Sequence, residues 1–173
     1  MAKSDELFID ATFKVAPKKY YQLLNIWGYI LSLKIYVPLA HIIMNSKTKF
    51  AYKHIFRSLK ELLSDNNINA KFESKIITTD YEKSLRKAIT EILKPKYLQG
   101  CYFHFSKAIW KKCRDYGLTS KKFKKESIIF TFCLKIYPYV HNNNRFDYIE
   151  KLKDYIKDKD KRFHKFLNYF IRN

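Results

Sequence analysis

Apolar and polar positions alternate through the first 45 residues in the manner of strands. The alternation predicts strands over residues 7–15, 20–31 and 36–44, with a turn at 16–19. The connections between these strands are short, which favours an antiparallel meander. The chain is therefore expected to begin with three neighbouring strands of one sheet.

Beyond residue 48 the apolar residues mostly recur at helical spacing, interrupted by short β-branched runs. The expected elements are a helix to about residue 63, a strand over 75–79, a helix closed by Lys94-Pro95, a strand over 97–105, and a helix from Ser106 to Gly117. From Lys121 onward every apolar stripe has helical spacing. The strand and helix order predicts an α/β fold with a mixed sheet, in which three antiparallel strands precede parallel ones and helices flank the sheet.

Two aspartates interrupt or end these strands. Asp10 lies inside the apolar run of the first strand, and Asp80 directly follows the fourth. The ribonuclease H-like fold has the same element order and places acids at these two points. Converging carboxylates are suited to a divalent metal ion. The alternatives are that Asp10 is an acid of a bulge or sheet edge and that Asp80 is a helix N-cap.

The charge balance narrows the classes of partner. Lysine and arginine number 35 against 16 acidic residues, which gives a net charge of +19. Such a field favours a polyanion, with nucleic acid as the first candidate and an anionic membrane surface as the second. An AT-biased genome would explain the preference for lysine over arginine, but it does not explain the deficit of acids. A hydrophobic content of 47% makes disorder an unsuitable description of most of the chain.

The cysteine count and the hydropathy pattern bear on location. The three cysteines, Cys101, Cys113 and Cys133, form no even framework, so a reducing compartment is expected. The most membrane-like stretch, residues 20–44, is interrupted by polar residues and proline, so neither a membrane span nor a membrane partner is expected.

Four phrases in this order resemble the transposase domain of Mutator-like elements. They are IDATFK at 9–14, YVPLA at 36–40, TDYEK at 79–83 and GCYFHFSKAIW at 100–110. The resemblance implies a ribonuclease H-like catalytic core that belongs to the superfamily with an acidic triad. It also implies a DNA partner, a nuclear location and the possibility of homo-oligomers. By this resemblance, residues 1–117 would form an incomplete ribonuclease H-like core, and residues 118–173 would form an all-helical insertion region.

The resemblance also implies residue roles. Asp10 and Asp80 would be the first two catalytic acids and would bind Mg²⁺ or Mn²⁺. The family's third acid is a glutamate beyond the insertion, and no position of this chain matches it. The chain therefore resembles a C-terminally truncated catalytic domain whose ancestral reaction is DNA strand cleavage and transfer, and it is expected to be inactive alone. The alternative is a non-catalytic DNA-binding or protein-interaction module.

Two further groups of residues are candidates for function. Cys101 and His104 match a C-x-x-H element of the family. A structural role near the acids is favoured over zinc, because four ligands are normally needed and a strand would point the two side chains to opposite faces. A basic cluster after Phe105 is either a solvated face or a surface for phosphates. Its members are Lys107, Lys111, Lys112, Arg114, Lys121, Lys122, Lys124 and Lys125.

Overall fold

A computed structural model describes residues 6–13, 15–65 and 75–172. Within it the chain divides into two compact units, Met1–Cys101 and Tyr102–Asn173. Each unit has its own cluster of buried apolar side chains. The domain limits expected from the family resemblance, 1–117 and 118–173, remain a prediction. The boundary between the two compact units lies earlier, after Cys101.

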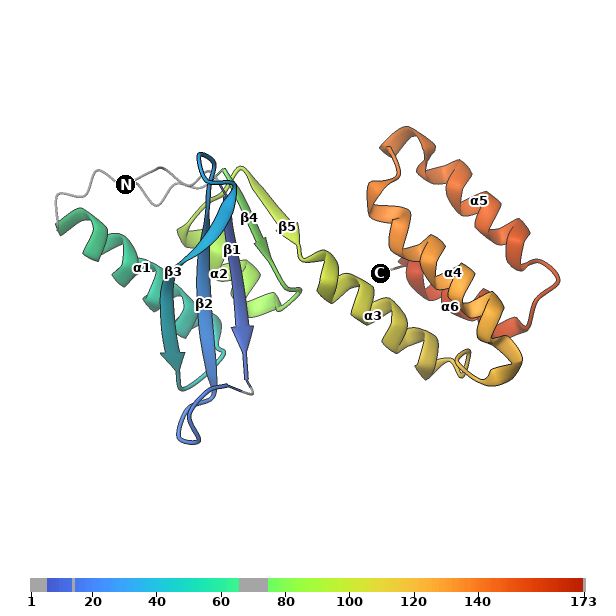
Figure 1. Cartoon of the computed structure of the whole chain (residues 1–173), viewed down its shortest axis with the longest axis horizontal. Coiled ribbons are helices and arrows are strands. Elements are labelled where there is room, and N and C mark those ends of the chain that lie inside the picture. The colour runs from blue at the N-terminus through green and yellow to red at the C-terminus, as the bar shows by residue number, and fades with distance from the viewer. Residues whose placement is uncertain (1–5, 14, 66–74, 173) are drawn as a thin grey trace. The chain divides into compact units, whose positions relative to one another are not determined.

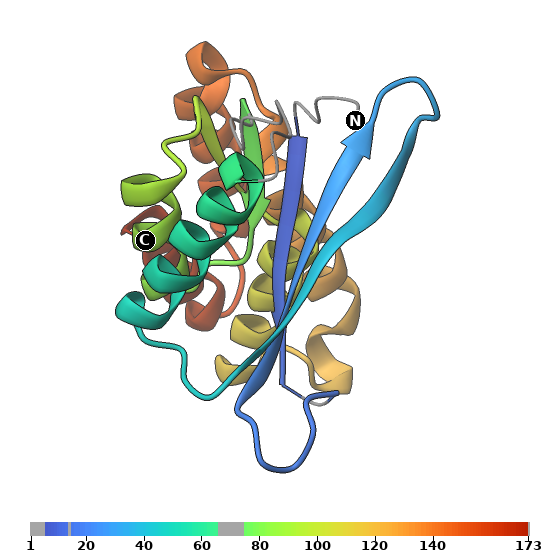
Figure 2. The ribbon, with the colours of Figure 1, turned by 90° about the vertical axis from the view of Figure 1, so that its left-hand side faces the viewer.

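The first unit is a five-stranded sheet with helices on one face (Figures 1 and 2). Its strands are β1 (Glu6–Thr12), β2 (Gln22–Ile30), β3 (Ile35–Met44), β4 (Ile76–Thr79) and β5 (Tyr97–Gly100). The strand order is β3-β2-β1-β4-β5. The pairs β1–β2 and β2–β3 are antiparallel, and β1–β4 and β4–β5 are parallel. The mixed α/β sheet expected from the element order is thus confirmed.

Helices α1 (Lys49–Asp65) and α2 (Lys83–Ile92) cover one face of this sheet (Figure 2). Alternate residues of the strands point to that face, and those residues are the buried ones. Ile9, Leu24 and Ile77 pack there against Tyr52 and Phe56 of α1 and Leu85 and Ile89 of α2.

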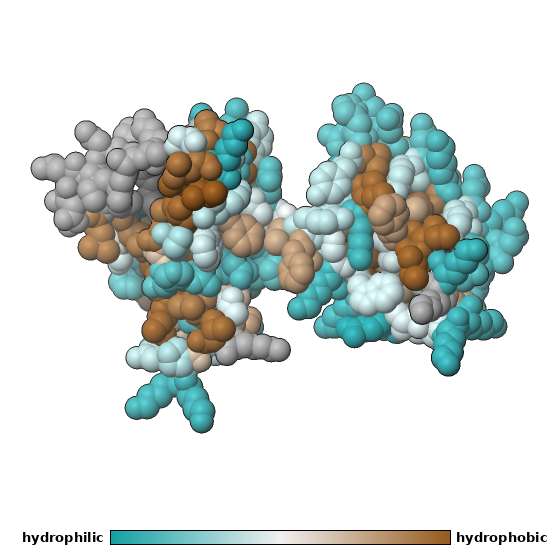
Figure 3. Space-filling model, viewed as in Figure 1, coloured by the Kyte–Doolittle hydropathy of each residue, from teal (hydrophilic) through white to brown (hydrophobic). Residues whose placement is uncertain are grey.

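Apolar side chains also remain exposed in the first unit. Among them are Leu31 in the β2–β3 turn and Leu39 and Ile43 on β3. Figure 3 shows apolar surface over this region.

The second unit is entirely helical. It contains α3 (Tyr102–Asp115), α4 (Lys124–Ile136), α5 (Arg145–Ile156) and α6 (Lys161–Arg172), with short 3₁₀ segments η1 (Lys121–Phe123), η2 (Tyr137–Tyr139) and η3 (Asn142–Asn144). Its core is rich in aromatic rings: Phe130 meets Phe163 and Phe166 edge to face, with ring centroids 5.3 and 5.7 Å apart. The helical C-terminal region is confirmed. Gly117 follows α3 with φ at 68°, as expected for a helix terminus.

One element differs from its prediction for a clear physical reason. The strand expected over 97–105 ends at Gly100, and α3 begins at Tyr102 instead of Ser106. The last backbone bond of this ladder runs from the amide of Cys101 to the carbonyl of Thr79, where β4 also ends. Residues beyond Cys101 therefore have no continuing partner in β4. As a helix, they place Ile109 and Cys113 in the second core.

Candidate metal and nucleic-acid sites

Asp10 and Asp80 each follow a residue of the same in-register pair on two neighbouring strands of the sheet. β1 and β4 are parallel, and Ile9 is in register with Thr79; the next residues along the chain are Asp10, which is still in β1, and Asp80, which directly follows the end of β4. Ile9 and Thr79 are buried on the helix-covered side, so the half-buried aspartates that follow point to the opposite face. Neighbouring strands are about 4.8 Å apart. The fold thus gives neighbouring positions to two aspartates that are 70 residues apart in the sequence.

Hydrogen bonds hold one oxygen of each carboxylate. The hydroxyl of Thr12 donates to Oδ2 of Asp10 at 3.1 Å, and the amide of Glu82 donates to Oδ1 of Asp80 at 3.0 Å. The second bond forms a local turn before α2, whose N-cap residue is Glu82. The alternative that Asp80 is the N-cap is therefore wrong, although the carboxylate of Asp80 does accept a bond from the backbone amide of Glu82.

Asp10 is neither at a bulge nor at a sheet edge. β1 is the middle strand of five, and its ladder with β2 runs without a shift through the pair Asp10–Asn25. That alternative from the sequence is wrong. Asp10 is instead a half-buried carboxylate in the middle strand, on the face opposite to the one that α1 and α2 cover.

A polar row continues from Asp10 across the sheet. Asn25 pairs with Asp10 on one side and with His41 on the other, and His41 Nδ1 lies 2.7 Å from Asn25 Oδ1. The position of His41 within an apolar strand predicts a hydrogen-bonded core residue; the hydrogen bond is present, but the side chain is exposed. Asn25 was not identified from the sequence. The available signal was one polar residue inside each of three successive apolar strands.

Behind Asp80, a buried polar chain links three elements. Gln22 Nε2 donates to the hydroxyl oxygen of Tyr52 at 2.6 Å, and that hydroxyl donates to Oε2 of Glu82 at 3.1 Å. Burial raises the pKa of Tyr52, so its hydroxyl remains a donor. Burial also raises the pKa of Glu82; the bond from Tyr52 opposes this shift, and the charge of Asp80 adds to it. The backbone amide of Glu82 therefore donates to the carboxylate of Asp80, while the hydroxyl of Tyr52 donates to the side chain of Glu82.

The raised pKa of Glu82 predicts a pH-dependent contribution to stability. An acid whose pKa is higher in the folded state stabilises that state fully below its unfolded pKa of about 4.5. This contribution is lost as pH rises through the folded pKa. Urea unfolding at pH 4 and at pH 8 measures this contribution. Between pH 4 and pH 8 the free energy of unfolding is expected to fall more in the wild type than in Glu82→Gln. Parallel pH profiles for the two proteins would contradict the shift.

Cys101 and His104 are not on one strand, so the argument from opposite strand faces was wrong. Cys101 is buried at the end of the first unit, and His104 is half-buried in the first turn of α3, in the second unit. Across residues 6–13, 15–65 and 75–172, no group of three or more His, Cys, Asp or Glu side chains is arranged to hold a metal ion. The structural role suggested for His104 stays a prediction.

The basic residues expected to cluster after Phe105 do not all lie on one surface, because α3 turns Lys112 away from the other cations of the helix. Lys107, Lys111 and Arg114 are exposed and share one side of α3, as predicted. Lys112 lies at the border of the buried side, with its Nζ 4.5 Å from the ring centroid of Tyr169. The side chains of Lys121, Lys122 and Lys125 are exposed, and the side chain of Lys124 lies outside the described residues.

Comparison with known families places the chain in one of them. The profile of the MULE transposase domain matches residues 6–108, which is more than half of the chain and includes both aspartates. The chain belongs to this family and is a transposase-derived protein. A search of curated proteins found no match. In the described part of the chain, no helix is both long and apolar enough to cross a membrane.

Proposed function

We propose that Asp10 and Asp80 belong to a ribonuclease H-like site for DNA strand cleavage and transfer. The observation that carries this proposal is the register of the parallel strands β1 and β4, in which Ile9 and Thr79, the residues just before the two aspartates, are paired. Membership of the MULE transposase domain family supports it. The fixed carboxylates described above would bind and orient a cation without a large rearrangement.

The donor atoms fit a hard divalent cation. Carboxylate oxygens of Asp10 and Asp80 are the ligands that Mg²⁺ and Mn²⁺ prefer, and no sulfur ligand is needed. When bound, such ions activate a water or 3′-hydroxyl and stabilise the leaving oxygen of a phosphodiester. The described residues place no third carboxylate in a metal-holding group with these two. We therefore expect this chain by itself to bind the ion weakly and to have little or no cleavage activity.

Removing either aspartate tests the proposal directly. Asp10→Asn and Asp80→Asn are each expected to weaken Mn²⁺ binding about tenfold or more. Removing a residue that only hydrogen-bonds to a metal ligand already lowers metal affinity about tenfold, and removing the ligand itself lowers it at least as much. Asparagine still accepts the bonds from Thr12 and from the Glu82 amide, so the fold is retained. Titration calorimetry with MnCl₂ measures the effect.

The control is Asp158→Asn, which removes one exposed carboxylate from the second unit. Its Mn²⁺ affinity is expected to equal that of the wild type. If Asp10→Asn bound Mn²⁺ as tightly as Asp158→Asn, the two strand acids would not form the site.

A second function rests on charge. Residues 102–173 contain 18 lysines and arginines against 7 acids, a net charge of +11. The exposed cations of α3 and η1 would contact phosphates and give DNA affinity with little sequence preference. The chain would then act as a DNA-binding module even without cleavage. A DNA affinity that did not fall with added salt would contradict this role.

A further inference from the structure

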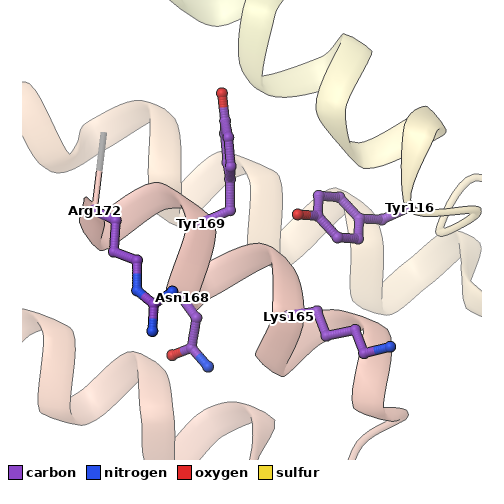
Figure 4. A pocket seen from close by; sticks show the side chains of 5 residues that line it. All are labelled: Tyr116, Lys165, Asn168, Tyr169 and Arg172. Atoms are coloured by element: carbon purple, nitrogen blue, oxygen red, sulfur yellow. The ribbon is translucent and has the colours of Figure 1, made fainter.

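A hollow of about 490 Å³ opens on the helical unit, between the end of α3 and the outer side of α6. Its lining combines two aromatic rings, two cations and an amide (Figure 4). The residues are Tyr116, Lys165, Asn168, Tyr169 and Arg172. All lie within the second unit.

Contacts inside the unit hold both tyrosine rings in place. The ring of Tyr116 stacks on that of the buried Phe166, with centroids 5.4 Å apart and planes 13° from parallel. The ring of Tyr169 is covered on one side by the ammonium of Lys112 at 4.5 Å. Both tyrosines are half-buried. A ligand that stacks on a ring already held by the protein loses little side-chain entropy on binding.

The polar groups of the hollow come from one side of α6. Lys165, Asn168 and Arg172 are exposed at positions i, i+3 and i+7, so they form a row. At the helical rise, the Cα atoms of Lys165 and Arg172 are about 10.5 Å apart along the axis. The five lining residues include no acid. The nearby Asp115 lies 3.9 Å from the ammonium of Lys112.

We propose that this hollow binds a nucleotide segment of single-stranded DNA. Lys165 and Arg172 contact successive phosphates, and an unpaired base stacks at the tyrosines. The aromatic lining favours a single strand over a duplex, because paired bases present no free face for stacking. The cations favour a phosphate chain over a neutral or basic peptide. This inference rests on the DNA-binding function proposed above and gives it a location.

Fluorescence anisotropy with labelled oligonucleotides tests the proposal. The probes are a 12-nucleotide oligo(dT), an abasic strand of equal length and a duplex of random sequence. The wild type is expected to bind the abasic strand about 5- to 100-fold more weakly than oligo(dT), which corresponds to the usual strength of base stacking on aromatic side chains. The variant Lys165→Gln/Arg172→Gln is expected to lower the slope of log affinity against log salt for oligo(dT) by about 1.4.

The matched control is Lys151→Gln/Lys157→Gln, which removes the same charge from exposed positions of the same unit. It is expected to keep the wild-type slope and the preference for bases. Circular dichroism confirms that all variants are folded. Equal losses in the two double variants would overturn the hollow as the site while leaving general DNA binding intact. Failure of the wild type to bind any probe would instead overturn the DNA-binding function itself.

Photocrosslinking locates the base independently of the substitutions. Oligo(dT) that carries one 5-iododeoxyuridine is expected to crosslink to Tyr116 or Tyr169, identified by mass spectrometry of the peptides. Crosslinks confined to residues outside the hollow would overturn the proposal even if the salt slopes behaved as expected.

Discussion

Replacing Phe166 with alanine is expected to lower the free energy of unfolding of the helical unit by about 3–5 kcal/mol. Phe166 has no exposed surface, and its ring contacts those of Tyr116 and Phe130. The substitution removes the buried ring and leaves a cavity that these neighbours fill only in part. It also removes the support behind Tyr116, so the hollow on α6 is expected to bind oligonucleotides more weakly.

The chain has two tryptophans, Trp27 in the first unit and Trp110 in the second, so each unit has its own fluorescent reporter. In a Trp27→Phe background, urea unfolding followed through Trp110 measures the helical unit. The control is Phe146→Ala on α5, a ring that is 73% exposed, and a change of less than about 0.5 kcal/mol is expected. Equal effects of the two substitutions would show that Phe166 is not a core residue.

Replacing Phe56 with alanine is expected to destabilise the first unit by a similar amount, about 3–5 kcal/mol. Phe56 is fully buried on α1, in the cluster that includes Ile9 of β1 and Ile77 of β4. These two strands carry Asp10 and precede Asp80. Loss of packing beneath them is therefore expected to weaken Mn²⁺ binding as well as stability.

Trp27 fluorescence in a Trp110→Phe background measures this effect. Phe50→Ala provides the control on the same helix, because Phe50 is 77% exposed and its loss is expected to cost less than about 0.5 kcal/mol. If Phe56→Ala unfolded at the same urea concentration as Phe50→Ala, α1 would not support the sheet in the way described.

Local periodicity predicted most of the elements correctly. Alternation identified β1, β2 and β3 to within a few residues, and helical spacing identified α1 and α2, because burial of one face imposes these periods on the sequence. The positions of Asp10 and Asp80 also followed from the sequence, since a carboxylate within or beside an apolar strand is conspicuous. Their adjacency required the register of β1 and β4, which no local pattern contains.

Periodicity alone failed where the partner of a segment decides its structure. Residues 101–105 are apolar enough for a strand, but the β4 ladder ends at Thr79 and the segment becomes the start of α3. The hydrogen bonds from Gln22 to Tyr52 and from Tyr52 to Glu82 join residues that are up to 60 positions apart in the sequence. Lys112 belongs to the basic cluster by sequence, but in the fold its ammonium lies 4.5 Å from the ring centroid of Tyr169, 57 residues further on.

The sequence by itself determined the class of fold, the family and the two acids, because these depend on residue types in order and on local period. Tertiary structure decided which residues become neighbours: Asp10 and Asp80 through the pairing of β1 with β4, Asn25 with His41, and Tyr116, just after α3, with Tyr169 of α6 around one hollow. The physical reason is that strand register and helix packing arise from contacts between segments far apart in the chain, which no short stretch of sequence specifies.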